Sequence, residues 1–312
     1  NIMESKIKFG FRIHQSGYSF GELKNAVTLA DQLGYYSVTL YDLLGIPTLE
    51  CWTTLAAFAG ITENIRLTPM VLANLYRPPF LLAKMGATLD VISNGRFELG
   101  IGAGGSLRDH QSAGIGFPDT PKRVAMLEES VLLITNLWKD DNTTFTGSFY
   151  QTSQASINPK PIQKPHPPLI IGGHGERHLL RAVAKYANVC NIGSELSLLE
   201  HNQKLQLLEA HCRQVDRDFS EIEVTHNTRV IIAKSASDFE EKVSALAQAA
   251  HMEINQYKTE ISKSIHGTPD QCIGQIQSYI DYGIQYFFLI FPDPIRSEDL
   301  MLFSEHVMPA FN

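Results

Sequence analysis

Residues 76–105 read Y-R-P-P-F-L-L-A-K-M-G-A-T-L-D-V-I-S-N-G-R-F-E-L-G-I-G-A-G-G in a chain of 312 residues. Between residues 79 and 92, apolar side chains recur three and four positions apart, which predicts an amphipathic helix. We expect that helix to end at Ser93-Asn94-Gly95 and residues 97–101 to form a strand. This stretch is therefore one helix–strand unit, and a glycine-rich loop finishes it.

The loop carries Gly100, Gly102 and Gly104 at alternate positions, with Gly105 next to the last of them. Glycines allow a neighbouring backbone or a flat ligand to come close, although tight packing alone explains a lone G-x-G-x-G more often. A dinucleotide fingerprint would follow the first strand of its unit and precede an acidic residue by about 20 positions. Here the glycines follow a fourth strand and lead into a polar segment, residues 106–118, so a Rossmann fold is not expected.

Strand-like and helix-like patterns alternate along the whole chain. Strands are expected at residues 7–13, 37–41, 65–70, 97–101, 169–171, 189–192, 222–233 and 286–291. Helices are expected at residues 19–33, 50–61, 79–92, 121–138, 176–186, 196–214, 239–250, 269–282 and 298–308. Eight strands, each followed by helix, predict an α/β fold of the TIM (β/α)8 barrel type. A doubly wound open sheet is the competing fold, but it needs fewer strands and a split strand order.

Three segments interrupt the alternation, at residues 104–120, 139–168 and 251–264. Within the second, residues 140–151 have the character of a hairpin, and residues 158–168 form an extended connector punctuated by prolines. We interpret these segments as insertions, after strand 4 and before strand 5 and again near the C-terminus. Because α/β barrels of this size are routinely single domains, residues 1–312 are expected to form one barrel domain.

The composition narrows the class of protein. The chain has 26 Lys and Arg against 33 Asp and Glu, a net charge of -7, and no dense basic run, so nucleic acid and anionic membranes are poor candidate partners. No apolar stretch approaches the ~20 residues of a membrane span, and the first residues do not resemble a signal peptide. The four cysteines show no C-x-x-C spacing. These features predict a cytoplasmic protein with reduced thiols, no metal site and a small-molecule partner.

In a TIM barrel the chemistry lies at the carboxyl ends of the strands. The residues there include neither a clustered pair of carboxylates nor a G-x-S-x-G motif. Three candidates for a general acid or base remain: Asp42 after the second strand, His14 after the first and His110 after the fourth. Each has a structural alternative, because a histidine alone is more often a hydrogen-bonded structural residue and Asp42 could simply fix its loop.

A second glycine-rich loop, Gly172-Gly173-His174-Gly175, follows the fifth strand and opens a helix that begins with Arg177. Backbone N–H groups and the positive end of a helix bind anions, and an arginine adds a charge-assisted hydrogen bond. The alternative is an ordinary strand-to-helix turn, but three glycines in four residues exceed what such a turn needs. The loop therefore predicts a site for a phosphate group.

These motifs resemble those of the luciferase-like oxidoreductases, TIM-barrel enzymes that use FMN or the deazaflavin coenzyme F420. The similar blocks cover nearly the whole chain: Tyr41-Asp42, E-C-W-T-T-L-A-A-F-A (50–59), I-R-L-T-P-M-V (65–71), residues 82–104, G-I-G-F-P (114–118), residues 158–177, A-K-Y-A-N-V-C-N (184–191), G-T-P-D-Q (267–271) and residues 282–292. The resemblance is strongest to the F420-dependent branch, and it implies hydride transfer between F420 and a small organic substrate.

The resemblance also implies cofactor contacts and an assembly. A non-proline cis peptide would join Met70 to Val71 behind the ring, and the phosphate would lie at the loop from Gly172 to Gly175 with Arg177. Further contacts would come from Gly102, Gly104, Gly105 and Asn191. The family further suggests a homodimer that packs through the second and third helices.

Two positions depart from the family pattern. Most relatives have Asp-His at the end of strand two and G-A-G-W at the end of strand four, where this chain has Asp42-Leu43 and Gly104-Gly105. The histidine is a catalytic acid or base in several members, so here that role is vacant or has moved to His14, Asp42 or His110. Two alternatives therefore stay open: an FMN-dependent monooxygenase supplied by a flavin reductase, and a catalytically degenerate flavin-binding protein.

Overall fold

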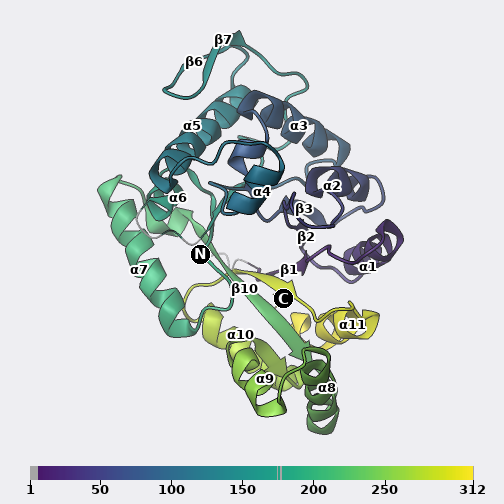
Figure 1. Ribbon diagram of the computed structural model, residues 1–312. Helices are drawn as coiled ribbons and strands as arrows, with labels where there is room; N and C mark the ends of the chain where they lie inside the picture. The colour runs from purple at the N-terminus through teal and green to yellow at the C-terminus, as the bar shows by residue number, and fades with distance from the viewer. Residues whose placement is uncertain (1–5, 174, 176–177, 312) are drawn as a thin grey trace.

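Strands and helices alternate through the part of the chain that the structure describes, residues 6–173, 175 and 178–311 of a computed structural model (Figure 1). The strands are β1 Lys8–Ile13, β2 Ser37–Leu40, β3 Arg66–Pro69, β4 Leu72–Ala73, β5 Leu99–Gly102, β6 Thr143–Thr146, β7 Gln151–Ala155, β8 Leu169–Gly172, β9 Val189–Asn191, β10 Glu223–Ile232, β11 Ile265–Gly267 and β12 Tyr286–Ile290. The helices are α1 Phe20–Gln32, α2 Cys51–Ala59, α3 Pro79–Ile92, α4 Leu107–Ser112, α5 Thr120–Lys139, α6 Leu179–Tyr186, α7 Leu198–Gln214, α8 Ala236–Ala249, α9 Ile254–Glu260, α10 Pro269–Ile280 and α11 Ser297–His306. Short 3-10 turns lie at Asn74–Tyr76, Phe219–Glu221, Ile261–Lys263 and Met308–Phe311.

Eight strand positions in this described part form a parallel barrel, in the order β1, β2, β3 with β4, β5, β8, β9, β10 and β12. Strand β12 pairs back with β1. Strands β3 and β4 share one position: Leu67 bridges to Phe97 just ahead of β5, and β4 pairs with β5 in parallel. The predicted TIM barrel is therefore confirmed, and all eight predicted strands are present with ends shifted by a few residues.

Helix α3 and strand β5 show how the local sequence sets these elements. Helix α3 spans the predicted residues 79–92, with Pro79 at its first position, where no backbone N–H is needed. Asn94 and Gly95 then take positive φ angles of 55° and 80°, which end the helix and turn the chain toward β5. The helix buries Leu82, Ala83 and Leu89 among other residues against the barrel.

Two segments expected to be irregular contain helices. Helix α4 lies within residues 106–118 and has Ser106 as its N-cap, whose side chain accepts a hydrogen bond from the Asp109 N–H. Helix α9 lies within residues 251–264 and is followed by the 3-10 turn Ile261–Lys263. Both helices have seven residues or fewer, too short for an apolar repeat to identify them.

The interior of the barrel is polar at the amino ends of the strands. Glu98 is 2% exposed and accepts hydrogen bonds from Arg66 Nε at 2.9 Å, Thr68 Oγ1 at 2.7 Å and Tyr286 Oη at 3.1 Å. Nearby, Lys8 pairs with Glu223 at 2.8 Å. Each of these charges has a partner of opposite sign, as buried charges require. This end of the barrel is therefore closed by paired side chains.

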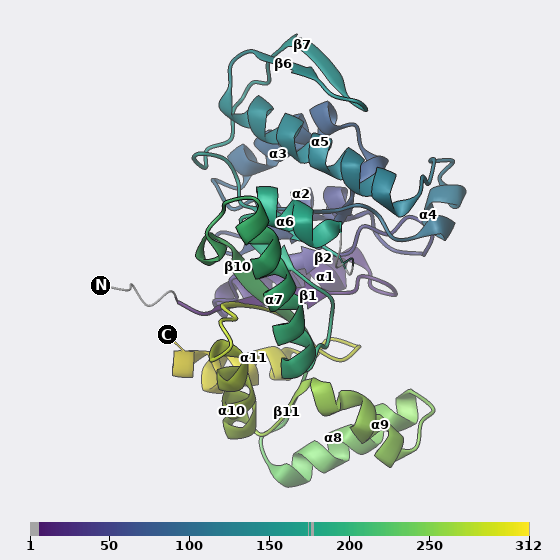
Figure 2. The same cartoon turned by 90° about the vertical axis from the view of Figure 1, so that its left-hand side faces the viewer.

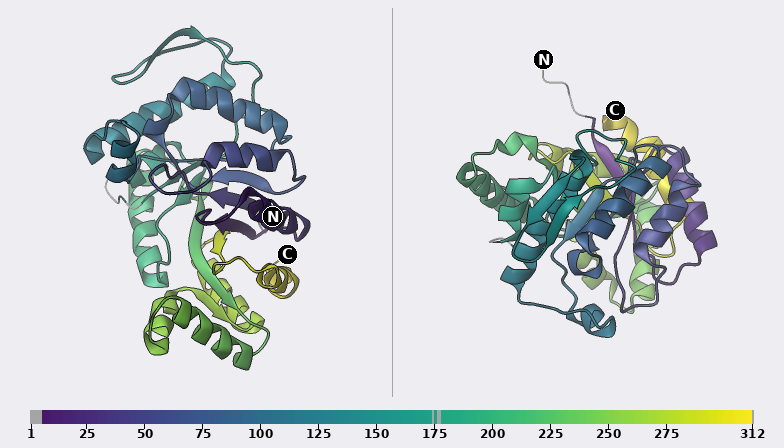
Figure 3. Two further views of the ribbon diagram at one scale, coloured as in Figure 1. Left: turned by 45° about the vertical axis from the view of Figure 1, so that its right-hand side comes forward. Right: turned by 90° about the horizontal axis from the view of Figure 1, so that it is seen from above.

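Two parts of the structure extend beyond the ring of barrel helices (Figures 1 and 2). Strands β6 and β7 form an antiparallel hairpin at one end of the molecule, outside α3 and α5. At the opposite end, β10 continues past its pairing with β12 and pairs with β11, beside α8 and α9 (Figure 3). None of the helices described here is both long and apolar enough to cross a membrane.

Candidate active site

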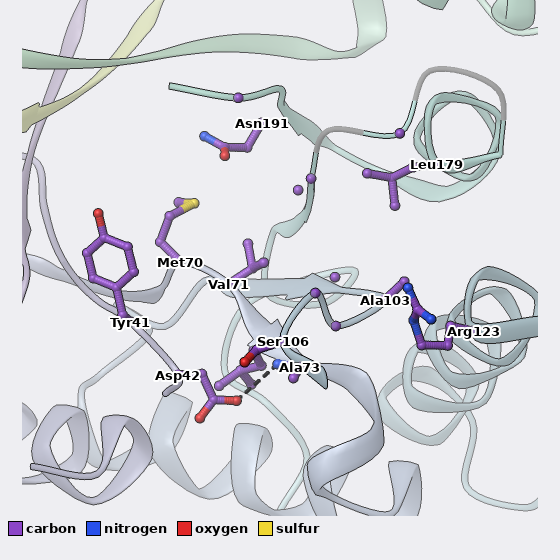
Figure 4. Close-up of a pocket in the computed structure, with 18 of the residues that line it drawn as sticks. Tyr41, Asp42, Met70, Val71, Ala73, Ala103, Ser106, Arg123, Leu179 and Asn191 are labelled. Carbon is purple, nitrogen blue, oxygen red and sulfur yellow. Dashed lines mark hydrogen bonds between the residues drawn. The ribbon is translucent and has the colours of Figure 1, made fainter. Parts of the chain in front are cut away.

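A cavity of about 710 Å³ opens at the carboxyl ends of the barrel strands. Side chains and backbone from the ends of β1 to β5, β8, β9 and β10 line it, together with the first turns of α5 and α6. Figure 4 shows Met70 and Val71 in the middle of this wall, Tyr41 to one side of them, and Asn191 and Leu179 across from them. The cavity therefore lies where a TIM barrel places its chemistry.

Residues predicted as cofactor contacts come together around this one cavity. Those that line it are Met70, Val71, Gly102, Gly104, Gly105, Gly172, Gly173, Gly175 and Asn191. Two others, His174 and Arg177, lie outside the residues that the structure describes. Of the three predicted acid–base candidates, Asp42 lines the cavity, whereas His14 and His110 are not among its lining residues.

The peptide bond between Met70 and Val71 is cis, as the resemblance implied. The glycines of the neighbouring strands make room for this segment. A Cβ atom on Gly100 would lie 1.9 Å from the Pro69 carbonyl oxygen, and one on either Gly102 or Gly172 would lie 2.9 Å from a methyl carbon of Val71. The strand glycines are therefore explained by close packing, and what they pack against is the segment that lines the cavity.

The last two glycines of the loop behave differently. Gly104 has a φ of +83°, a conformation that side-chain-bearing residues rarely adopt, and a Cβ there would lie 3.2 Å from Cε1 of His110. Gly105 is exposed, and a Cβ there would meet nothing within 4 Å. The mouth of the cavity is therefore open at Gly105.

Asp42 is fixed by hydrogen bonds on the cavity wall. Its side chain is 1% exposed, and its two oxygens accept hydrogen bonds from Arg77 Nη1 at 2.9 Å and Nη2 at 3.0 Å. Oδ2 also accepts the N–H of Ala73 at 3.0 Å, a contact drawn in Figure 4. Arg77 pairs in turn with Glu50 at 2.6 Å. Asp42 therefore holds the segment that follows the cis bond, and its carboxylate is buried in these contacts at the edge of the cavity.

His110 lies behind the cavity wall and is fully buried. Its Nδ1 is 2.8 Å from the Ser106 carbonyl oxygen, and its Nε2 has no hydrogen-bond partner among the described residues. The ring packs between Tyr76 and Phe117, at centroid distances of 4.9 and 4.6 Å. Burial, with the nearby Asp109, raises the pKa of Tyr76 to about 12, so near neutral pH the Tyr76 hydroxyl stays protonated.

His14 is half-buried, and its ring lies 4.9 Å from that of Tyr41, which does line the cavity. Both histidines therefore contact residues of the wall, His14 through Tyr41 and His110 through Tyr76 and Gly104. Neither touches the cavity directly.

Asn191 and Asn227 form an amide pair across β9 and β10. Asn191 Nδ2 donates to Asn227 Oδ1 at 2.9 Å and to Thr225 Oγ1 at 2.8 Å, and Asn227 Nδ2 donates to Asn191 Oδ1 at 3.1 Å and to the Gly193 carbonyl oxygen at 2.6 Å. Because each amide fixes the other, both side chains hold one orientation at the cavity wall.

Two arginines of the cavity were not predicted from the sequence. Arg123, in the first turns of α5, stacks over Phe117 at 3.9 Å, donates to Thr120 Oγ1 at 3.1 Å, and has an Nε without a partner. Arg12, on β1, is 8% exposed. The sequence feature that could have identified Arg12 is the alternating, inward register of β1. For Arg123 it is the position near the start of a helix that follows the fourth strand.

The described residues contain no group of three His, Cys, Asp or Glu side chains placed to hold a metal ion. All four cysteines are free and buried, and burial raises the pKa of the Cys190 thiol to about 12. A thiol with so high a pKa is a poor nucleophile near neutral pH. The chemistry that the cavity can support therefore falls to its arginines, Asp42 and a bound cofactor.

The sequence pattern of the family described as luciferase-like monooxygenase matches residues 3–286 of the chain. Among curated proteins, a protein of Amycolatopsis mediterranei (strain U-32) named F420-dependent glucose-6-phosphate dehydrogenase is 27% identical, and the match covers 97% of this chain and 98% of that protein. A protein with the same name from Microbacterium testaceum (strain StLB037) is also 27% identical, over 98% of each chain.

Solved structures share the fold. The coenzyme F420 dependent tetrahydromethanopterin reductase of Methanopyrus kandleri superposes with a TM-score of 0.81 at 19% identity, over 98% of this chain and 100% of that one. A long-chain alkane monooxygenase superposes with a TM-score of 0.80 at 13% identity, over 99% of this chain and 91% of the other. At these identities the likeness shows the barrel and not the reaction.

Proposed function

We propose, from the premise that the chain belongs to the luciferase-like monooxygenase family, that it is an oxidoreductase that uses the deazaflavin coenzyme F420 and a small organic substrate. The observation that carries this proposal is the cavity itself. Nine of the expected cofactor contacts line it around the cis bond between Met70 and Val71. The curated relatives named as F420-dependent align with nearly the whole chain, which supports F420 as the first cofactor to test.

The residues present fit such a cofactor. The cavity wall at Met70 and Val71 offers an apolar surface for a flat ring, and the glycines beside it bring no side chains into the space. Arg123 lines the cavity, its buried Nε has no hydrogen-bond partner among the described residues, and Gly173 and Gly175 line the cavity near the start of α6. We propose Arg123 and this backbone as the phosphate anchor, together with Arg177.

When bound, F420 would supply the hydride chemistry, and the protein would bind, orient and exclude water. Asp42 and Arg77 keep the segment after the cis bond in place, and the amide pair of Asn191 and Asn227 fixes two hydrogen-bonding groups on the opposite wall. Because both sets of contacts join protein groups to one another, they hold the two walls in one arrangement.

Of the three acid–base candidates, we propose Asp42 as the group that acts at the cavity, because it alone of the three lines it. His14 and His110 would act through Tyr41 and Tyr76, the wall residues they contact. Asp42→Asn keeps the shape of the side chain, so we expect it to lower kcat at least about tenfold, and loss of an acid or base would also flatten one limb of the pH–rate profile. An unchanged profile would assign Asp42 to positioning alone.

The cofactor is tested by binding. We expect the purified protein to bind F420 at micromolar concentration, measured by the fluorescence of the coenzyme, and Arg123→Gln to weaken binding by about tenfold or more, since a hydrogen bond to a charged group is lost. Arg213, which is mostly exposed on α7, provides the matched control as Arg213→Gln. Glucose 6-phosphate, the substrate in the relatives' names, is the first compound to assay. Equal F420 affinity in both variants would contradict the phosphate assignment.

The second candidate is an FMN-dependent monooxygenase that receives reduced flavin from a reductase. The description of the matching family as luciferase-like monooxygenase is the observation behind it. Mass spectrometry of the extracted ligand separates the two, and recovery of FMN together with substrate-dependent oxygen uptake would replace the leading proposal. A flavin-binding protein without turnover is the third candidate, and any substrate-dependent bleaching of the bound cofactor would exclude it.

We also propose a homodimer and a cytoplasmic location. Helix α3 exposes four apolar side chains, Phe80 at 41%, Leu81 at 49%, Val91 at 39% and Ile92 at 57%, which a partner copy would cover. Light scattering of the purified protein tests the dimer, and Leu81→Glu should dissociate it. The four free cysteines agree with a reducing compartment.

A further inference from the structure

Arg12 is a buried cation with no carboxylate partner among the residues that the structure describes. The residue is 8% exposed and lines the cavity, and its Nε and Nη1 atoms are buried with no hydrogen-bond partner. The described contact that orients the guanidinium is the ring of Tyr41, 4.5 Å from the Arg12 Cζ atom. Burial lowers the pKa of this guanidinium, although an arginine still keeps its charge near neutral pH.

The carboxylates of the cavity are already engaged elsewhere. Asp42 is held by Arg77 and the Ala73 N–H. Asp109 accepts the backbone N–H groups of Leu44 at 3.3 Å and Gly45 at 3.1 Å. No described carboxylate makes an ion pair with Arg12. A buried, uncompensated charge costs several kcal/mol, so a fold keeps one where something else supplies the opposite charge.

A second unpartnered group lies beside Arg12. Thr39 is its register partner on β2 and is fully buried, and the Thr39 hydroxyl has no hydrogen-bond partner. Two neighbouring strands thus place a cationic donor and a hydroxyl next to each other, and neither is satisfied by the described protein. Buried polar groups are normally paired, but Thr39 is not among the residues that line the cavity, so the case for a ligand rests on Arg12, which does line it.

Arg12 is also far round the barrel from the proposed phosphate anchor. Strand β8, which carries Gly172, is the fourth strand position from β1 in either direction round the barrel. The cofactor phosphate and the Arg12 cluster therefore belong to opposite walls. An anion bound at Arg12 must therefore be a different group from the coenzyme phosphate.

We propose that Arg12, which lines the cavity, binds a carboxylate or phosphate group of the substrate. This subsite rests on the proposed function only in that the anion is assigned to a substrate and not to the coenzyme. It commits the substrate class to organic anions. It also explains why a buried arginine is kept without an ion-pair partner on the wall opposite the phosphate anchor.

The test is thermal unfolding of the protein without added coenzyme, in sodium phosphate and in sodium chloride of equal ionic strength. The Arg123→Gln background removes the proposed coenzyme-phosphate cation, so that the remaining phosphate response reports Arg12. We expect phosphate to raise the Tm of that protein by about 2–4 °C, since a ligand that binds the folded state stabilises it. Adding Arg12→Met should remove the part of the rise that exceeds the general stabilising effect of phosphate, and adding Arg12→Lys should retain some of that part.

Arg12→Met alone carries an expectation of opposite sign. Met has a similar volume and no charge, so this variant should unfold at a higher Tm than the natural protein in chloride. F420 affinity should stay within about twofold in Arg12→Met, because the proposed site of the coenzyme phosphate lies on the other wall. The general stabilising effect of phosphate on Tm acts on every variant alike.

Three results would overturn the subsite. They are the absence of a phosphate-induced rise in Tm in the Arg12-containing protein, an undiminished rise after Arg12→Met, and a lower Tm of Arg12→Met in chloride. A tenfold loss of F420 affinity in Arg12→Met would reassign Arg12 to the coenzyme. Failure of F420 to bind at all would contradict the proposed function and leave the phosphate measurement intact.

Discussion

At the amino ends of the barrel strands, Glu98 accepts hydrogen bonds from Arg66, Thr68 and Tyr286, whereas at the carboxyl ends Arg12 borders the cavity with two unpartnered guanidinium nitrogens. The same strands supply both sets of residues. Lys8 and Arg12 even share strand β1, and Lys8 has its partner in Glu223. One end of the barrel therefore satisfies its charges internally, and the other leaves them for a ligand.

The difference teaches where stability and function separate in this fold. Paired charges at the closed end make the interior complete without any ligand. At the open end, glycines and the cis segment create a volume that the protein does not fill, and a cation remains in its wall. Substitutions at the two ends should consequently fail in different ways, and four of them test the contrast.

The largest effect is expected from Glu98→Ala at the closed end. Removing this carboxylate leaves Arg66 without its ion-pair partner and Thr68 without an acceptor, so the free energy of unfolding should fall by about 3–5 kcal/mol. Urea unfolding measures it. Glu241→Ala, at an exposed position of α8, is the control and should change stability by less than about 0.5 kcal/mol. Equal losses in both variants would remove the distinction between the two ends.

Gly100→Ala tests the boundary between the ends. Its Cβ would lie 1.9 Å from the Pro69 carbonyl oxygen, so the strand or the segment after it must shift, at a cost of about 1–3 kcal/mol. Cofactor affinity should fall with it, because that segment lines the cavity. Gly105→Ala is the matched control at the open mouth, where the new methyl group meets nothing within 4 Å. A Gly100→Ala protein as stable as the control would refute the close-packing explanation.

The stability of the fold at low pH should depend on His226, a buried side chain that, unlike Arg12, can be neutral in the folded protein. His226 on β10 is 2% exposed and stacks on Tyr279 at 4.0 Å; burial, with a smaller effect of His201, lowers its pKa to about 3. Between pH 6.5 and 3 His226 is protonated in the unfolded chain but not in the folded protein. Stability should therefore be lost as pH falls below about 6.5, by up to about 1.4 kcal/mol per pH unit from this group.

Urea unfolding at a series of pH values measures that slope, and His226→Phe provides the comparison. The phenyl ring keeps the stacking contact with Tyr279 and cannot take up a proton, so the loss of stability below pH 6.5 should be smaller in this variant. An identical pH dependence in the two proteins would show that His226 is not the group that makes the fold sensitive to acid.

The smallest effect on stability is expected from Gly105→Trp at the mouth. The position is exposed and open, so the free energy of unfolding should change by less than about 0.5 kcal/mol. The indole should nevertheless cover bound coenzyme, and quenching of F420 fluorescence by acrylamide should decrease. Unchanged quenching would mean that residue 105 does not control access to the cavity.

The helix–strand unit at residues 76–105 shows how much of the fold was predictable. Helix α3 has the predicted bounds, because a proline start, an apolar spacing and an Asn-Gly end are all local signals. Helices α4 and α9 were missed because they are too short to show a repeat. The barrel followed from eight repeats of the alternation, which tolerates errors of a few residues at each end.

The site could be predicted from the sequence where it depends on a feature of the backbone. Glycine loops mark close approach in the sequence itself, and the glycines of both loops that the structure describes line the cavity or pack against its wall. Arg12 and Arg123 carry no such mark. An arginine in a strand or in a first helical turn reads the same whether it is paired or not, since an ion-pair partner can lie tens of residues away in the chain, as Glu98 does from Arg66.

The sequence by itself determined the alternation of strands and helices, the places where only glycine fits, and the resemblance that implied a flavin-type cofactor. Those properties depend on neighbours within one or two turns of the chain, where spacing and backbone freedom act directly. Only the tertiary structure decided which charges are paired. Asp42 pairs with Arg77 and Glu98 pairs with Arg66, whereas Arg12 has no carboxylate partner among the described residues. These pairings depend on which strands the barrel brings together, and they set the balance of charge at each end.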